Sequence, residues 1–129
     1  MPMILVIDDD EHFRSYLEAL LVRAGYTARS LSNGRELMKL LDREPVDVIV
    51  TDLYMPFTDG IEVVCAVRRS RPDLPIIGVT GGRGSLAEPC IQAMRVLGAS
   101  NVIAKPLDAP AFLKMVERAL KVKARNSES

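Results

Sequence analysis

The chain has few cysteines, no excess of either charge and no long apolar run, and each absence excludes a class of protein. Its two cysteines, Cys65 and Cys90, form no CxxC pair and no Cys/His cluster. Neither a disulfide framework nor a zinc site is therefore expected, and the chain suits a reducing cytoplasm. Lysine plus arginine number 17, and so do aspartate plus glutamate. Because nucleic-acid and membrane-surface binders depend on a cationic surplus, we expect neither nucleic acid nor membrane as a partner.

We expect neither a targeting segment nor a membrane-spanning segment in this sequence. No stretch approaches the ~18 consecutive apolar residues of a membrane span. The apolar start, residues 1–7, lacks the basic residues and the length of a signal peptide. The 129 residues, 48% hydrophobic and 26% charged, are typical of one globular domain with a single core. We expect that domain over residues 1–122, followed by a polar tail over residues 123–129 that frays.

Short apolar, β-branched runs alternate five times with stretches of helical periodicity. Several runs are apolar at every position, as expected of parallel strands covered on both faces, whereas the second is the most polar and suits a sheet edge. This alternation predicts an α/β doubly wound fold, a parallel sheet with helices on both faces. The predicted strands are Met3–Ile7, Tyr26–Leu31, Val46–Thr51, Pro75–Thr80 and Asn101–Ala104.

Apolar stripes and capping residues mark the helices. The stripes fall within residues 13–24, 37–41, 61–67, 91–97 and 112–120. The start of the fourth helix stays open between a capping box from Ser85 and a first helical residue at Pro89. The other predicted terminal residues are Gly25 after the first stripe, Asn33 with Glu36 before the second, Asp59 with Glu62 before the third, and Asp108 before the last.

Polar side chains follow four of the predicted strands. Because the strands are parallel, their carboxyl ends share one edge of the sheet, which is where such sheets bind ligands. Carboxylates, a hydroxyl and an ammonium are therefore predicted to converge there. They are Asp8, Asp9 and Asp10 after the first strand, Asp52 after the third, Thr80 at the end of the fourth and Lys105 after the fifth.

This set of side chains suits phosphoryl transfer to a carboxylate. Neighbouring carboxylates raise one another's pKa unless a cation binds, and Mg²⁺ prefers such oxygen ligands, so Asp8 and Asp9 are predicted to seat the metal. Asp52 can act as a nucleophile toward phosphorus and form an aspartyl phosphate. Lys105 would supply a fixed cation and Thr80 a hydroxyl donor to the phosphoryl oxygens.

Three residues near this set are assigned other roles. Asp10 is expected to cap the helix that follows it. His12, the single histidine, falls in the first helical turn and is expected to be solvated, with a role as base or phosphoryl carrier as the alternative. Pro106 permits a cis peptide bond that would turn Lys105 into the site.

The four motifs that carry these residues resemble the receiver (CheY-like) domain of two-component response regulators. The resemblance covers essentially the whole chain and implies a five-stranded (βα)₅ flavodoxin-like fold with strand order 2-1-3-4-5. It also implies that Asp52 takes a phosphoryl group from a sensor histidine kinase or a histidine phosphotransfer protein. The motifs are residues 4–10, residues 52–60, Val79-Thr80-Gly81, and Gly98-Ala99-Ser100 leading to Lys105-Pro106.

The same resemblance implies a ligand set. Asp9, Asp52 and the backbone carbonyl of Tyr54 would bind Mg²⁺, with Mn²⁺ as a possible substitute and Asp8 helping through water. Thr80, Gly81 and Lys105 would surround the phosphoryl group. The implied protein is a signalling domain that phosphorylates and dephosphorylates itself, without a separate catalytic domain.

The sequence departs from the family pattern where the family's output switch lies. The usual aromatic position before the lysine is occupied by Val102, and Gly81 replaces the common alanine and is followed by Gly82-Arg83-Gly84. Val102 is small and has few rotamers, whereas the glycines give broad backbone freedom. The sequence therefore predicts that the phosphorylation signal is carried by residues 81–90 and not by a rotamer change on the fifth strand.

Because no output domain follows in this sequence, we expect a stand-alone regulator, a monomer or weak dimer, that acts through an unknown downstream protein target. A relay intermediate, a binding effector and a piece of a longer protein stay open. Two other classes of protein share part of this pattern. A haloacid-dehalogenase-like phosphatase also has Asp-x-Asp after a first strand, but Glu11-His12 follow here in place of Gly-Thr. A flavodoxin-like cofactor binder needs backbone and hydroxyl donors in its first loop, which here has carboxylates.

Overall fold

The computed structural model describes residues 1–53, 60–80 and 101–128. Strands and helices alternate along the chain, and the strands form one five-stranded parallel sheet of order β2-β1-β3-β4-β5, which confirms the predicted fold and strand order. In chain order the elements are β1 (Met3–Ile7), α1 (Glu11–Arg23), β2 (Thr27–Leu31), α2 (Leu37–Arg43), β3 (Val48–Asp52), α3 (Gly60–Ser70), β4 (Ile76–Thr80), β5 (Asn101–Ala104) and α5 (Ala109–Glu128). The fourth predicted helix lies outside the described residues.

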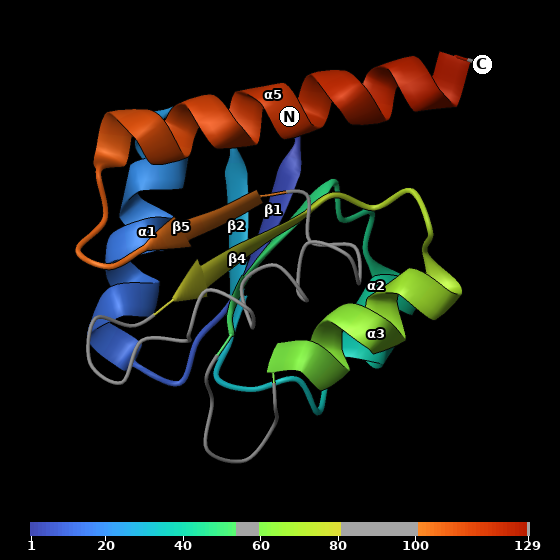
Figure 1. Ribbon diagram of the computed structural model, residues 1–129, viewed down its shortest axis with the longest axis horizontal. Helices are drawn as coiled ribbons and strands as arrows, with labels where there is room; N and C mark the ends of the chain where they lie inside the picture. Colours follow the sequence, from blue (N-terminus) through green and yellow to red (C-terminus); the bar gives the residue numbers. More distant parts are fainter. Residues whose placement is uncertain (54–59, 81–100, 129) are drawn as a thin grey trace.

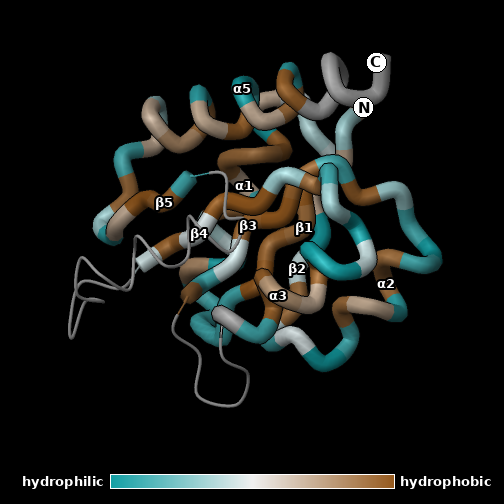
Figure 2. The backbone as a smooth tube through the Cα atoms, turned by 45° about the vertical axis from the view of Figure 1, so that its right-hand side comes forward, coloured by the Kyte–Doolittle hydropathy of each residue, from teal (hydrophilic) through white to brown (hydrophobic). Residues whose placement is uncertain are grey.

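The helices cover both faces of the sheet and so create two apolar cores. Helices α1 and α5 lie on one face, and α2 and α3 lie on the other (Figure 1). Because successive residues of a strand point to opposite faces, an all-apolar strand such as β1 feeds both cores. Leu5 and Ile7 pack toward α2 and α3, whereas Ile4 and Val6 pack toward α1 and α5. Figure 2 shows the hydrophobic strands enclosed between helices with hydrophilic outer turns.

The strand ends differ slightly from the sequence prediction. Strand β2 starts at Thr27 and is an edge strand, as its polarity predicted. Strand β3 covers Val48–Asp52 and not Val46–Thr51. Its start is delayed because Asp47 pairs with Met3 through both its backbone N–H and its side-chain Oδ2, at 2.8 Å each, before the ladder begins. Asp52 is therefore the last residue of β3.

The termini of α1 follow the predicted capping pattern. Asp10 Oδ1 accepts hydrogen bonds from the backbone N–H groups of His12 at 3.0 Å and Phe13 at 3.3 Å, so Asp10 is the N-cap. Gly25 follows the C-cap residue Ala24 with a φ of +97°, a left-handed conformation that favours glycine. Both predictions are confirmed.

The start of α2 was predicted wrongly. The sequence favoured a capping box from Asn33, but the helix begins at Leu37. The Asn33 Oδ1 atom instead accepts from the backbone N–H of Arg35 at 2.8 Å, and Glu36 at the N-cap position makes no capping hydrogen bond with its side chain. Asparagine side chains compete with helical hydrogen bonds in this way, and here the local turn wins.

Helix α5 extends beyond its predicted apolar stripe. Residues 123–128, expected as a polar tail that frays, continue the helix to Glu128, and the fraying itself stays a prediction. Lysine, alanine and arginine in this stretch are strong helix formers, and Lys121 pairs with Glu117 one turn earlier at 3.1 Å. At the other end Asp108 is the predicted cap, and its Oδ1 accepts from the backbone N–H of Ala111 at 3.2 Å.

Candidate functional site

The carboxyl ends of the strands bring the predicted site residues to one edge of the sheet. The ladders pair Ile7 with Thr51, Asp52 with Val79 and Thr80 with Ala104, so that β1, β3, β4 and β5 end at the same level. The edge is largely shielded from solvent. The relative exposures are 1% for Asp8, 6% for Asp52 and 3% for Thr80.

Three carboxylates form the centre of this edge. Asp8, Asp9 and Asp52 each offer an oxygen, and these oxygens lie within 4.8 Å of one another. Asp9 is exposed, whereas the other two are buried. Burial raises the pKa of Asp8, since it disfavours the charged form; the hydrogen bond from the Asp10 backbone N–H and the nearby Lys105 ammonium act in the opposite direction.

Lys105 connects two of these carboxylates. Its Nζ lies 3.2 Å from Asp8 Oδ2 and 3.8 Å from Asp52 Oδ2. The backbone N–H of Lys105 donates to the Thr80 carbonyl at 2.9 Å, which ties the end of β5 to the end of β4. The Lys105–Pro106 peptide bond is cis, the geometry considered for it in the sequence. One ammonium is thus shared by two of the three clustered carboxylates.

Two residues of the first helix also belong to the site, and the sequence reasoning missed both roles. The ring of Phe13 lies under Lys105, with Nζ 4.1 Å from the ring centroid. Arg14 donates from Nη1 to the backbone carbonyl of Asp8 at 2.9 Å. Phe13 was assigned only to the apolar stripe of its helix, where it does pack against the core. The sequence signal for both roles was that Phe13 and Arg14 lie in the first turns of the helix that follows the aspartates.

The structure describes only some of the remaining predicted residues. His12 is exposed in the first turn of α1. Val102 pairs with Gly78 in the sheet and is partly buried against the α2/α3 core. Tyr54, Gly81 and the segment 81–90, to which the ligand and switch predictions refer, lie outside the described residues.

The donor set of this edge fits a hard divalent cation. It consists of clustered carboxylate oxygens, and Asp8 is held in place by the Asp10 backbone N–H at 2.8 Å and by Lys105. Mg²⁺ binds such oxygens in proteins and keeps several waters. The ammonium leaves negative charge within the cluster uncompensated, and this charge favours a cation.

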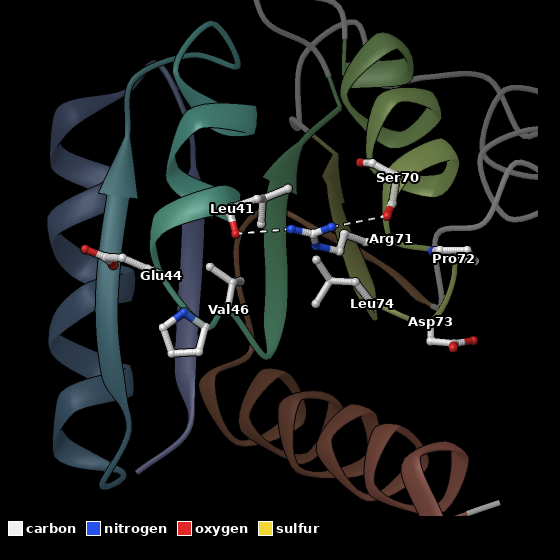
Figure 3. Close-up of a pocket in the computed structure, with 9 residues that line it drawn as sticks. Leu41, Glu44, Val46, Ser70, Arg71, Pro72, Asp73 and Leu74 are labelled. Carbon is white, nitrogen blue, oxygen red and sulfur yellow. Dashed lines mark hydrogen bonds between the residues drawn. The ribbon is translucent and has the colours of Figure 1, made fainter.

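A hollow lies at the opposite ends of β3 and β4 and is separate from the carboxylates. Its volume is about 380 Å³, and it is lined by residues from the ends of α2 and α3 and the turns after them (Figure 3). Arg71 reaches across it and donates from Nη2 to the Leu41 carbonyl at 3.3 Å. The same guanidinium pairs with Asp42 at 3.5 Å. Arg71 therefore links α2 to α3, and the hollow takes no part in the carboxylate site.

Comparison with known proteins identifies relatives over almost the whole chain. The response regulator receiver domain matches residues 4–117. Response regulator protein PilR of Pseudomonas aeruginosa is 34% identical over 125 residues, which cover 97% of this chain and 27% of that protein. The DNA-binding transcriptional regulator NtrC of Escherichia coli is 32% identical over 118 residues, covering 92% of this chain and 24% of that protein. The chain thus spans about a quarter of the length of these curated relatives.

Solved structures show the same likeness in three dimensions. Chemotaxis protein CheY4 of Vibrio cholerae has a TM-score of 0.84 and 29% identity, and the match covers 93% of this chain and 99% of that one. A response regulator receiver domain protein of Clostridium thermocellum has a TM-score of 0.85 and 26% identity, with 96% and 98% covered. Within the described residues, no helix is both long and apolar enough to cross a bilayer.

These matches support a receiver domain. They support neither of the two alternative classes, the dehalogenase-like phosphatase and the flavodoxin-like cofactor binder. Phosphorylation on aspartate in two-component signalling is characteristic of the matching family, whose members are signalling domains and not separate enzymes. The family binds Mg²⁺ at an acidic pocket, and three aspartates of this chain cluster at the carboxyl edge of its sheet. The chain belongs to the response regulator receiver domain family.

Proposed function

We propose that Asp52 accepts a phosphoryl group from a sensor histidine kinase or a histidine phosphotransfer protein in a Mg²⁺-dependent reaction. The observation that carries this proposal is the grouping of the Asp52 carboxylate with those of Asp8 and Asp9, and with the Lys105 ammonium 3.8 Å away. Asp52 is the last residue of a buried strand, so its carboxylate has a fixed place at the sheet edge. A fixed nucleophile surrounded by charge-stabilising groups is what phosphoryl transfer requires.

The metal is proposed to be held by Asp8, Asp9 and Asp52, with the Tyr54 backbone carbonyl as a further ligand and Mn²⁺ as a substitute. When bound, the ion supplies neutralisation of the charge on the transferring group. Two hydrogen bonds to Asp8 support this ligand set. The Asp10 N–H fixes the Asp8 side chain, and the Arg14 guanidinium fixes the Asp8 carbonyl. Asp9 is the exposed member of the cluster, so its carboxylate would be accessible to an ion from solvent.

The chain's own residues account for the transfer step. A carboxylate oxygen of Asp52 forms a bond to phosphorus while the bond from phosphorus to the donor's imidazole nitrogen breaks, and that nitrogen keeps the electron pair. The Lys105 ammonium lies 3.8 Å from Asp52 Oδ2, so it can move to stabilise the negative charge on the phosphoryl oxygens. Thr80, buried at the end of β4, and Gly81 are proposed to donate to the other phosphoryl oxygens. Later attack by water on phosphorus releases phosphate and restores the carboxylate.

Output is proposed to pass through contacts of the phosphorylated receiver surface with a downstream protein segment in the cytoplasm. The relatives that the chain matches include a protein named as a DNA-binding regulator, of which this chain covers about a quarter. The balanced charge of 17 cations and 17 anions supports protein, and not nucleic acid, as the direct partner of these 129 residues. The chain is proposed to act as a monomer or weak dimer.

Labelling with a small phosphodonor tests the proposal. The purified protein, incubated with acetyl phosphate and Mg²⁺, should gain one phosphoryl group, and it should gain none with a chelator present. Asp52→Asn should abolish the gain. Asp73→Asn is the matched control, because Asp73 is an exposed aspartate in the turn before β4, at the other end of that strand from Thr80. Equal labelling of Asp52→Asn and the wild type would refute the assignment.

A further inference from the structure

We propose that Phe13 is a positioning residue that holds the Lys105 ammonium beside Asp52 through the face of its aromatic ring. The inference rests on the proposed function, because the position of Lys105 matters only if Asp52 receives the phosphoryl group. It assigns to the first helix a part in the site that goes beyond packing against the sheet.

Within the described residues, three groups lie close to the Lys105 ammonium. Nζ lies 3.2 Å from Asp8 Oδ2, 3.8 Å from Asp52 Oδ2 and 4.1 Å from the centroid of the Phe13 ring. The lysine side chain keeps 23% of its exposure, so solvent is open to it as an alternative. The ring therefore limits the directions in which the ammonium can leave the two carboxylates.

The Phe13 ring is itself held in place. The backbone N–H of Phe13 donates to the capping carboxylate of Asp10 at 3.3 Å, and the Phe13 side chain packs against the α1/α5 core. The ring of Tyr16, one turn further along α1, lies with its centroid 6.2 Å away. Because the helix cap and the core fix Phe13, its ring is a firm support for a flexible lysine.

An aromatic ring suits this task better than a further carboxylate. The ring attracts the cation through its quadrupole, yet it accepts none of the three ammonium N–H groups in an ordinary hydrogen bond. Those donors stay available for Asp8, for Asp52 and for phosphoryl oxygens. A lysine has a long stem with many rotamers, so confining it before the reaction lowers the entropy lost when the charge moves onto the phosphoryl group.

A magnetic-resonance measurement tests the contact without any phosphorylation. The Lys105 ε-methylene is bonded to Nζ, which lies 4.1 Å from the Phe13 ring centroid, so its protons should show an upfield ring-current shift in the metal-free protein. Phe13→Leu should remove the shift. Tyr16→Leu is the matched control, an aromatic residue of the same helix, and it should leave most of the shift in place. A Lys105 signal that is the same in Phe13→Leu and the wild type would overturn the proposal.

The kinetic test uses acetyl phosphate and Mg²⁺. Phe13→Leu should slow the labelling of Asp52 about three- to tenfold, the range expected from a partly desolvated cation–π contact. Phe13→Tyr should restore most of the rate, and Mg²⁺ affinity measured by calorimetry should not fall in either variant. Pentafluorophenylalanine at position 13 keeps the shape of the ring but reverses its quadrupole, so it should slow labelling even in a fully folded protein.

The outcomes separate this inference from the proposed function. If wild-type labelling is Asp52-dependent but Phe13→Leu and the fluorinated ring label at the wild-type rate, the positioning role is wrong and the phosphoacceptor stands. If Phe13→Leu is slow but the fluorinated ring is not, the side chain acts through its shape and the cation–π account is wrong. If Asp52→Asn labels like the wild type, the proposed function itself is wrong.

Discussion

Lys105 and Asp8 are 97 residues apart in the sequence, and their side chains meet at 3.2 Å. The strands that precede them, β5 and β1, are not neighbours, because β3 and β4 lie between them. The contact therefore crosses the carboxyl edge of the sheet and passes over Asp52 at the end of β3. It forms only when the whole sheet is assembled, so the ion pair reports directly on the integrity of the site.

Replacing Asp8 should stabilise the protein in the absence of metal. Burial raises the pKa of Asp8 above its ordinary value of 3.8, so that the folded state holds the proton to higher pH than the unfolded state. The free energy of unfolding therefore falls as the pH rises from 3.8 through the raised pKa, and ionised Asp8 destabilises the fold at neutral pH. In Asp8→Asn we therefore expect a higher melting temperature than in the wild type at pH 7.

The expected gain in Asp8→Asn should shrink when the pH is lowered, because the wild-type carboxyl is then protonated. Asparagine keeps an oxygen that can accept from the Asp10 backbone N–H, so this variant retains the local turn. Thermal melts of both proteins between pH 7 and the ordinary pKa of 3.8 measure the difference in melting temperature. A lower melting temperature of the variant at neutral pH would contradict the account.

Added Mg²⁺ should raise the melting temperature, since it binds the folded carboxylate cluster only. At an ion concentration of about ten times the dissociation constant the gain is roughly 1.4 kcal/mol. Asp9→Asn should remove most of this gain, whereas Glu11→Gln, an exposed acid in the first turn of the next helix, should keep it. Equal stabilisation of the Asp9 variant and the wild type would place the ion elsewhere.

Lys105 and Thr80 should act on the phosphoryl group and not on the metal. Lys105→Ala and Thr80→Ala are expected to retain the stabilisation by Mg²⁺, because neither side chain belongs to the carboxylate cluster. Both should weaken the structural response to phosphorylation, measured as the change in amide hydrogen exchange, and Thr80→Ser, which keeps the hydroxyl, should restore it. A loss of metal stabilisation as large as in Asp9→Asn would contradict these roles.

Gly78 is expected to tolerate no side chain, because a Cβ there would lie 2.9 Å from both Cδ atoms of Leu53. Leu53 follows Asp52, is 2% exposed and donates its backbone N–H to the Val79 carbonyl at 2.9 Å. Gly78→Ala should destabilise the protein by about 1–3 kcal/mol through overpacking. Adding Leu53→Val should recover part of the loss, and urea unfolding measures both. If the two substitutions changed the free energy of unfolding additively, this explanation would be contradicted.

The sequence predicted the sheet and the gathering of the site because both depend on local patterns. Strands β1 and β5 have the predicted bounds, since short runs containing apolar, β-branched residues identify strands well. Parallel strand order then places Asp52, Thr80 and Lys105 on one edge without further information.

The details that were missed depend on contacts between distant segments. The start of β3 is set by the pairing of Asp47 with Met3, and no local pattern near residue 47 indicates it. The contact of Phe13 with Lys105 joins α1 to the turn after β5, so periodicity alone assigned Phe13 to the core. The prediction that residues 81–90 carry the signal stays a prediction, since that segment lies outside the described residues.

Direct mapping of the phosphorylated residue tests the central claim most directly. The protein is incubated with acetyl phosphate and Mg²⁺, the acyl phosphate is reduced with borohydride to homoserine, and the modified residue is located by peptide mass spectrometry. The account predicts one modified position, Asp52, at the end of β3. Modification at Asp8 or Asp9, or none at Asp52 while other positions are labelled, would contradict it.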